Sequence, residues 1–234
     1  MQAVILAGGL GMRLRPFTEV IPKPLLPIGE ESVLEIQIAR LKHFGFDEIY
    51  LATNYKANYI ENFFGDGSRY GVKLTVSREV KPLGTAGPIA LLAKELRAPF
   101  IVMNGDILST IDFSALYRFA ESRDADLCVA VKKIITPFAF GNIFYEGDYV
   151  TRIEEKPDLE NLILAGIYVM KPSIFDLIPT DEQYDMNELI ESMLAAKRPI
   201  AKYEMKEMWL DIGQLPDYEH AQEVYDTHFK SEAN

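Results

Sequence analysis

Short apolar runs alternate with amphipathic segments along the first 131 residues, and this alternation constrains the fold more than any other feature. The runs have the length and β-branched content of buried strands, whereas apolar residues recur at helical spacing in the segments between them. The predicted elements are strands 3–7, 48–52, 72–76, 100–103 and 125–131 and helices 32–43, 58–64, 86–96 and 113–122. This order predicts an α/β fold in three layers, with a mostly parallel, twisted sheet and helices on both of its faces. Ligands of such sheets bind beyond the carboxyl ends of the strands.

The pattern changes after Gly141, where short strands follow one another with only turns between them. The predicted elements beyond this point are strands 142–145, 149–154, 162–170, 200–203 and 208–211 and a closing helix 216–229. We expect the first three of these strands to extend the same sheet in an antiparallel or mixed arrangement. Asp185 followed three residues later by Glu188 is typical of a capping box and predicts a further helix start.

Composition and charge exclude several classes of protein. The chain has 234 residues, of which 48% are apolar and 25% charged, and no linker, repeat or low-complexity segment divides it, so we expect a single domain over 1–234. Cys128 is the only cysteine, which excludes an internal disulfide and favours a reducing compartment, the cytoplasm. No apolar run approaches the roughly 20 residues of a membrane span, and no signal peptide is evident. A net charge of −11 argues against nucleic acid or an anionic membrane as the main partner.

The first predicted strand runs into a glycine-dense loop, Gly8-Gly9-Leu10-Gly11-Met12-Arg13. Such a loop lets backbone amides approach an anion closely. It is no dinucleotide fingerprint, because position 14 is Leu14, and no Gly-Lys-Ser/Thr follows that would make it a P-loop. A tight surface loop with one arginine is the alternative. Residues 1–25 nevertheless carry three basic side chains against one acidic in an acidic chain, which favours a polyphosphate ligand.

Prolines on both sides of Lys23 restrict the backbone, in the run Pro22-Lys23-Pro24. Together with the glycine loop, this run resembles the sugar-1-phosphate nucleotidylyltransferases, and most of all the short mannose-1-phosphate and heptose-1-phosphate guanylyltransferases. The resemblance extends to about residue 213. It implies a Rossmann-like nucleotidyltransferase fold, with a nucleotide-binding part at about 1–110 and a sugar-binding part at about 111–234.

Three later blocks match motifs of the same family. Pro82 to Gly87 reads by itself as a turn and helix start, but it resembles the family's segment along the nucleobase. Asn104-Gly105-Asp106 follows a strand, and its alternative is an Asn-Gly turn with a helix cap; the family has its metal-binding aspartate here, and Mg²⁺ prefers carboxylates and phosphate oxygens. The block 209–213 matches the family's second metal ligand, which implies Asp211. No cluster of His and Cys and no Ser-His-Asp arrangement is present in the sequence.

The sugar side of the site is implied by two further segments. Glu155-Lys156-Pro157 reads as a charged turn, whereas in the family a glutamate here binds sugar hydroxyls and the lysine binds the sugar phosphate. Ala165 to Tyr168, with Gly166, matches a segment that lines the sugar. Gly141 follows a phenylalanine where many members have tyrosine, so a contact that needs the hydroxyl is not expected.

The resemblance implies a reaction in which a sugar-phosphate oxygen attacks the α-phosphorus of a nucleoside triphosphate in line and pyrophosphate leaves. Positioning and charge neutralisation suffice, because the nucleophile is already an anion. The implied roles are catalysis by Arg13 and Lys23; nucleotide binding by Leu6, Gly8, Gly9, Gly11, Met12, Arg13, Gly84 and Thr85; sugar-phosphate binding by Gly141, Glu155, Lys156 and Gly166; and Mg²⁺ binding by Asp106 and Asp211. GTP and a mannose- or heptose-type sugar 1-phosphate are the favoured substrates.

Other functions remain open from the sequence. A uridylyl-, thymidylyl- or cytidylyltransferase acting on another sugar 1-phosphate or on a non-sugar phosphate shares much of the pattern. A catalytically silent regulatory subunit that senses nucleotide sugars is a hypothesis of another class, and the presence of all four charged site residues argues against it. Homodimers and homotetramers are common in the family, so a homo-oligomer is compatible with the resemblance.

Overall fold

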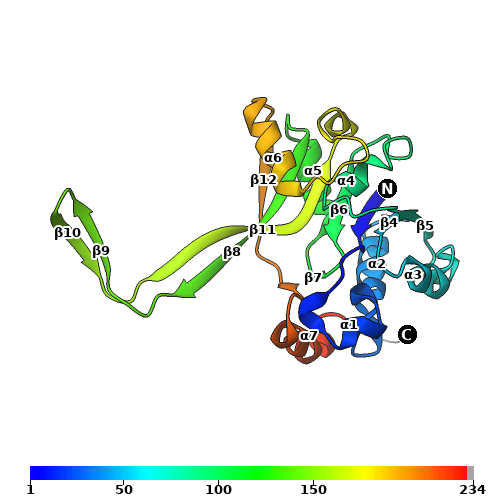
Figure 1. Cartoon of the computed structure of the whole chain (residues 1–234), viewed down its shortest axis with the longest axis horizontal. Coiled ribbons are helices and arrows are strands. Elements are labelled where there is room, and N and C mark those ends of the chain that lie inside the picture. Colours follow the sequence, from blue (N-terminus) through cyan, green and yellow to red (C-terminus); the bar gives the residue numbers. More distant parts are fainter. Residues whose placement is uncertain (231–234) are drawn as a thin grey trace.

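The computed structural model describes residues 1–230, and its central layer is a seven-stranded sheet (Figure 1). The strand order is β12-β8-β11-β6-β1-β4-β5. The bounds are β1 Gln2–Leu6, β4 Glu48–Thr53, β5 Lys73–Arg78, β6 Phe100–Asn104, β8 Leu127–Pro137, β11 Asp158–Met170 and β12 Ile200–Met205. β11 runs antiparallel to both neighbours, β6 and β8, and the remaining pairs are parallel. The predicted mixed, mostly parallel sheet is therefore confirmed.

Helices cover both faces of this sheet, which confirms the three layers. One face packs against α2 (Val33–His43), α3 (Ala57–Phe64) and α5 (Phe113–Glu121), through buried side chains such as Leu34, Ile60 and Phe113. The opposite face packs against α4 (Gly87–Ala90), the 3-10 helix η4 (Pro172–Leu177) and α6 (Met186–Ala195). The predicted capping box of Asp185 and Glu188 starts α6.

A third cluster attaches the closing helix α7 (Leu215–His228) to the segment that follows β1. That segment contains η1 (Met12–Leu14), α1 (Phe17–Val20), η2 (Lys23–Leu25) and the short strands β2 (Pro27–Ile28) and β3 (Glu31–Ser32). The remaining elements are η3 (Ser68–Tyr70), β7 (Ile107–Ser109), β9 (Asn142–Glu146), β10 (Tyr149–Glu154) and β13 (Trp209–Asp211). None of the helices within residues 1–230 has the length and apolar character needed to cross a membrane.

The helix predicted at 86–96 is wrong in its second half. Regular α-helix ends at Ala90, and the next amides bond to carbonyls three residues back, as Leu92 does to Ile89 and Ala93 to Ala90. Ile89, Leu92 and Leu96 are nevertheless buried. Their spacing of three and four residues suits such tighter turns as well as an α-helix, so the apolar pattern did not distinguish the two.

The expectation that residues 142–154 extend the main sheet is also wrong. β9 and β10 form a separate two-stranded sheet, joined to the main sheet by the outer halves of β8 and β11 (Figure 1). The ladder between β8 and β11 ends at the pair formed by Pro137 and Asp158, and Pro157 immediately precedes Asp158 in the sequence. Because proline has no backbone N–H to donate, these two prolines favour the end of the ladder at this point.

Candidate active site

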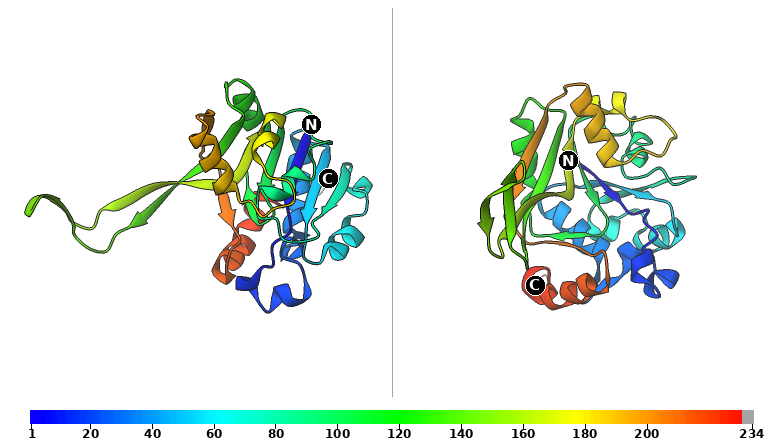
Figure 2. Two further views of the ribbon diagram at one scale, coloured as in Figure 1. Left: turned by 45° about the horizontal axis from the view of Figure 1, so that its top comes forward. Right: turned by 60° about the vertical axis from the view of Figure 1, so that its left-hand side comes forward.

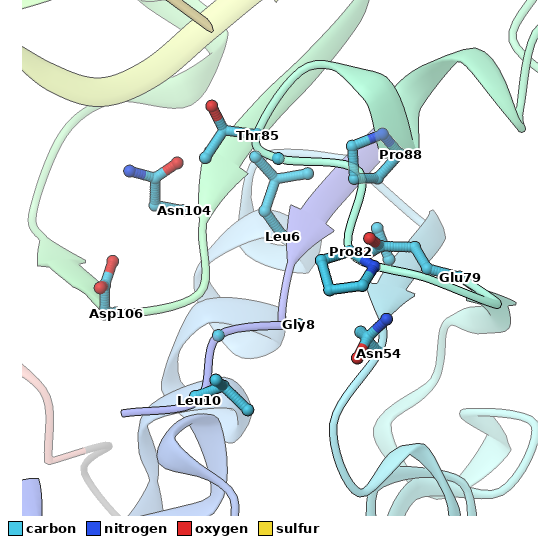
Figure 3. Close-up of a pocket in the computed structure, with 13 residues that line it drawn as sticks. Leu6, Gly8, Leu10, Asn54, Glu79, Pro82, Thr85, Pro88, Asn104 and Asp106 are labelled. Atoms are coloured by element: carbon cyan, nitrogen blue, oxygen red, sulfur yellow. The ribbon is translucent and has the colours of Figure 1, made fainter. Parts of the chain in front are cut away.

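The carboxyl ends of four neighbouring strands meet at one edge of the sheet and form a pocket there (Figure 3). β1, β4, β5 and β6 run parallel, so the residues that follow them lie side by side. The lining residues are Leu6, Gly8, Gly9, Leu10, Ala52, Asn54, Glu79, Pro82, Gly84, Thr85, Pro88, Asn104 and Asp106. Five of the residues predicted to bind nucleotide, and Asp106, therefore share this pocket.

A second hollow opens from the first along the glycine loop. It is lined by Gly9, Leu10, Gly11, Met12, Arg13, Lys23, Asp106 and Gly213, so Gly9, Leu10 and Asp106 border both. Gly11 has a φ of 61°, and a β-carbon placed on it would lie 2.7 Å from Cγ2 of Thr18. The Thr18 hydroxyl donates to the Gly11 carbonyl at 2.7 Å. Glycine is thus required at the turn that directs the chain into η1 and Arg13.

Lys23 lies inside this site and is paired with a carboxylate. Its ammonium donates to Oδ2 of Asp106 at 2.5 Å, and the lysine side chain is only 11% exposed. Pro24 beside it is buried, which holds this part of the chain against the body. The sequence-predicted cation and the first predicted metal ligand are therefore in direct contact.

The second carboxylate, Asp211, reaches Asp106 through a small antiparallel pair of strands. β7 pairs with β13 so that Asp211 lies opposite Ile107, and the amide of Ile212 donates to the Asp106 carbonyl at 2.9 Å. Burial raises the pKa of Asp211, and the charge of Asp106 raises it further, while Lys23 and Arg13 act in the opposite direction. Two close carboxylates are a donor set that fits a divalent cation.

This donor set is small. No group of three or more His, Cys, Asp or Glu side chains in residues 1–230 is arranged to hold a metal ion. Mg²⁺ is commonly bound by one or two carboxylates together with substrate phosphates. Asp106 and Asp211 fit that pattern, since the hollow beside Arg13 borders Asp106.

The segment at Gly84 is held by the start of α6. Gly84 has a φ of 79°, and a β-carbon on it would lie 2.6 Å from Oδ1 of Asp185. The amide of Thr85 donates to the same oxygen at 3.0 Å, and the amide of Met186 donates to the Thr85 hydroxyl at 2.8 Å. Gly84 lines the pocket, but the absence of its side chain serves close packing on Asp185.

Several residues of the site were not predicted from the sequence, and Gln37 and Glu79 are two of them that make polar contacts. Gln37 on α2 is 2% exposed, and its amide donates to the carbonyls of Asn104 at 2.9 Å and Ile107 at 2.7 Å, on both sides of Asp106. Glu79 follows β5, and its Oε2 accepts from the amide of Leu83 at 2.9 Å. A charged residue directly after a strand, as at Asp106, was the signal for Glu79, whereas Gln37 gave no signal beyond a polar residue on an apolar helix face.

Glu79 is a desolvated carboxylate at the pocket wall. Burial raises its pKa, and only the Leu83 amide opposes this. Its Oε1 lies 3.0 Å from where a β-carbon on Gly8 would be, next to Asn54 (Figure 3). No hydrogen bond or ion pair joins Glu79 to a cationic side chain within the described part of the chain.

The residues predicted to bind the sugar phosphate divide into two groups. Gly166, with a φ of 68°, lies at the site, since a β-carbon on it would be 2.7 Å from Nδ2 of Asn104. Gly141, Glu155 and Lys156 lie instead in the segments that connect β8 to β9 and β10 to β11, and they line neither hollow. Glu155 faces Gly141 there, with Oε2 3.3 Å from a β-carbon placed on the glycine. The structure does not bring these three residues to Asp106, and their role stays a prediction.

Known proteins are similar to this chain in sequence and in fold. Mannose-1-phosphate guanylyltransferase 1 from Arabidopsis thaliana and a probable mannose-1-phosphate guanylyltransferase 1 from Oryza sativa subsp. japonica are 37% and 38% identical over 227 residues, which is 93% of this chain. The chain spans 63% of the length of these relatives. HddC from Yersinia pseudotuberculosis, solved as a complex with GMP-PN, is 29% identical with a TM-score of 0.73, covering 96% of this chain and 99% of that chain.

A putative glucose-1-phosphate thymidylyltransferase from Bacillus anthracis shares the fold, with a TM-score of 0.79 at 24% identity over 96% of this chain and 94% of that chain. A family model described as nucleotidyl transferase matches residues 2–228. The match covers the glycine loop, both carboxylates and nearly every described element, as the sequence motifs predict. The chain therefore belongs to the nucleotidyl transferase family.

Proposed function

We propose that the protein is a sugar-1-phosphate nucleotidylyltransferase that joins GTP and a mannose- or heptose-type sugar 1-phosphate to give a GDP-sugar and pyrophosphate. The observation that carries this proposal is the proximity of four charged side chains beside the glycine loop: Arg13, Lys23 and Asp106 line one hollow, and the charges of all three act on Asp211. Two cations and two carboxylates at the edge of a parallel sheet suit phosphoryl transfer, in which catalysis is positioning and charge neutralisation. The mannose-1-phosphate guanylyltransferases among the relatives support the same class.

The reacting groups need no general base. A bond forms between a sugar-phosphate oxygen, already an anion, and the α-phosphorus, and the bond from the α-phosphorus to the leaving pyrophosphate breaks. We assign Arg13 and the amides of residues 9–12 to the β- and γ-phosphates, because these residues line the second hollow, along the glycine loop. Lys23 lies deeper, beside Asp106, and is assigned to the α-phosphoryl group.

Asp106 and Asp211 would hold Mg²⁺, and their geometry fits such a role. The ion supplies charge neutralisation for the phosphates when bound. The two carboxylates hold their own positions without it, because the β7–β13 pair and the amide of Ile212 fix the backbone of both. A cytoplasmic location belongs to the same proposal, for a chain whose one cysteine is 2% exposed.

Glu79 supports guanine as the base. The Watson–Crick edge of guanine presents two adjacent donors, N1–H and the 2-amino group, which match the two acceptor oxygens of a carboxylate. Uracil and thymine offer one donor between two acceptors, and cytosine and adenine offer an amino group beside an acceptor. A desolvated carboxylate gains most from paired donors, because an unpaired buried charge is unfavourable. Glu79 lies on the pocket wall, and no cationic side chain within residues 1–230 forms a hydrogen bond or ion pair with it.

Pyrophosphate release measured with GTP, UTP, dTTP and CTP against a panel of sugar 1-phosphates tests the proposal. GTP with a manno-configured sugar 1-phosphate is expected to lead by about tenfold or more in kcat/KM, the effect of one mismatched buried polar pair. UTP, dTTP or CTP outrunning GTP would overturn the guanylyl assignment alone. Absence of turnover with every pair would overturn the enzymatic proposal and favour a regulatory subunit.

A comparison of GTP with ITP tests the role of Glu79, because ITP lacks only the 2-amino group. The wild type is expected to prefer GTP, and Glu79→Gln is expected to lose most of that preference. Glu95→Gln, at an exposed position away from the pocket, serves as the matched control. An undiminished GTP-to-ITP ratio in Glu79→Gln would remove Glu79 from base recognition.

A further inference from the structure

A long arm leaves the body of the molecule. It comprises residues 132–164, the outer halves of β8 and β11 followed by the β9–β10 sheet, and both Figure 1 and Figure 2 show it projecting away from the helices. At its base Lys132 donates to the carbonyls of Lys206 and Glu207, and beyond this base no hydrogen bond or ion pair joins the arm to the rest of residues 1–230. No residue of the arm is buried. A two-stranded ribbon has no layer to pack on and is marginally stable by itself.

One face of the β9–β10 sheet carries four apolar side chains. Ile143 pairs with Ile153 and Tyr145 with Val150, and a register shift between Val150 and Arg152 keeps these two pairs on the same face although Val150 and Ile153 are three residues apart. They are 53–73% exposed. The opposite face carries Asn142, Glu146, Arg152 and Glu154 together with two aromatic residues, Tyr149 and Phe144, and the guanidinium of Arg152 covers the ring of Phe144 at 3.5 Å. Such an amphipathic sheet requires a cover on its apolar face.

A second exposed apolar surface lies at the mouth of the candidate active site. We call it the rim, and it consists of Leu10, Met12, Phe17, Val20 and Ile21, which are 38–67% exposed. Leu10 and Met12 also line the hollow beside Arg13. Apolar side chains are therefore uncovered both at the arm and directly at the site.

The two surfaces carry opposite charge. The arm has four basic and six acidic side chains, a net charge of −2, whereas residues 10–23 have three basic and one acidic, a net charge of +2. An acidic arm is unsuited to nucleic acid or an anionic membrane, and it suits a basic, apolar protein surface. The rim of this same chain is such a surface.

The arm does not meet the rim of its own chain, because it points away from the body (Figure 1). Its reach is large: seven residue pairs of the β8–β11 ladder and the β9–β10 sheet span about 40 Å at about 3.3 Å per residue. That length is enough to cross onto a neighbouring molecule. When a two-fold axis relates two identical chains, a contact between two different surfaces forms twice, and the result is a closed dimer.

We propose that two copies of this chain exchange arms, so that the apolar face of β9–β10 from one copy covers the rim of the other. Glu155 and Lys156 follow Ile153 by two and three residues, which places them within about 10 Å of the covered rim. Each copy thereby supplies Glu155 and Lys156 to the sugar-phosphate side of its partner's site. This inference rests on the proposed function, and it accounts for two residues that the arm keeps away from Asp106.

Sedimentation tests the exchange without any activity assay. The wild type is expected to be a dimer at micromolar concentration, and Tyr145→Glu/Ile153→Glu is expected to be a monomer with an unchanged thermal midpoint, because the arm contributes no core. Tyr59→Glu/Leu194→Glu, at similarly exposed sites on the body, is the matched control and should stay dimeric. A monomeric wild type, or a double arm variant that stays dimeric, would overturn the proposal.

Subunit mixing tests the contribution to the site. Asp106→Asn and Lys156→Ala are each expected to be nearly inactive alone. Mixed and re-equilibrated in equal amounts, they should regain about a quarter of wild-type activity, because half of the dimers are mixed and each has one complete site. Differently tagged chains confirm that mixed dimers form. Mixed dimers without regained activity would overturn delivery in trans, whereas an inactive wild type would instead contradict the proposed function.

Discussion

The ammonium of Lys23 donates to Oδ2 of Asp106 at 2.5 Å, across 83 residues of sequence. The pair joins the residue assigned to the α-phosphoryl group to a residue assigned to the metal. Both are partly shielded, since the side chains are 11% and 29% exposed. In the free protein Asp106 thus keeps Lys23 at the place where the transferring phosphoryl group is expected.

Lys23→Ala is expected to lower kcat by about 10²–10³-fold, the usual effect of one donor aimed at developing charge. The KM for the triphosphate should change far less, because the charge matters most in the transition state. Arg13→Ala should instead raise the KM for the triphosphate, since Arg13 lines the second hollow, where the β- and γ-phosphates are expected. Steady-state kinetics with Lys202→Ala as an exposed control decide this, and the opposite pattern would exchange the two roles.

Asp106→Asn and Asp211→Asn are each expected to abolish most turnover at saturating Mg²⁺ while the fold persists. An amide is a poorer ligand for Mg²⁺ than a carboxylate. Asp226→Asn, at an exposed carboxylate that pairs with exposed Lys230, is the control. Pyrophosphate release across a Mg²⁺ titration and far-UV circular dichroism measure the two effects. Near-normal kcat in either site variant would remove that residue from the metal site.

The sequence predicted the layers of the fold because apolar periodicity is a local signal. Strands β1, β4, β5 and β6 and helix α2 lie within one or two residues of their predicted bounds. The meeting of Asp106 and Asp211 followed only from the family resemblance, since it depends on the β7–β13 pair between segments about 100 residues apart. No local pattern specifies such a pairing.

The arm shows a different limit. β9 and β10 were predicted to within one residue, but alternation along a strand does not state which sheet the strand joins. The outer halves of β8 and β11 were not predicted, because the expected strands ended at 131 and began at 162. Gln37 was missed for a related reason: a glutamine on a buried helix face acquires a role only from the two carbonyls that the fold places beside it. The division into nucleotide- and sugar-binding parts stays a prediction.

Gln37→Leu is expected to destabilise the protein by about 1–3 kcal/mol, because two buried carbonyls lose their donor. The turn that carries Asp106 would also loosen, so the Mg²⁺ concentration for half-maximal activity should rise. Gln222→Leu removes a comparable pair of hydrogen bonds, to Pro27 and Gly29, at an exposed site away from both hollows. Urea unfolding and Mg²⁺ titrations should separate them, and equal metal dependence in both variants would contradict a positioning role for Gln37.

Glu79 predicts a pH dependence of stability and of GTP binding. Burial raises its pKa above the ordinary 4.5, so the folded protein holds this proton more readily than the unfolded chain does. The stability that protonation provides is fully present below the ordinary pKa and is lost as pH rises through the raised pKa. Glu79→Gln removes this loss, so the variant should match the wild type near pH 4 and exceed it in thermal midpoint at pH 8.

GTP binding should depend on the same proton with the opposite sign. Two N–H donors of guanine favour the ionised carboxylate, so the wild type is expected to lose affinity for GTP as pH falls through the raised pKa of Glu79. Glu79→Gln should bind GTP more weakly at pH 8 and should lack this pH-dependent step. Calorimetric titration with GTP and with ITP at several pH values measures both effects. An identical pH profile for wild type and variant would contradict a contact between the Glu79 carboxylate and the bound base.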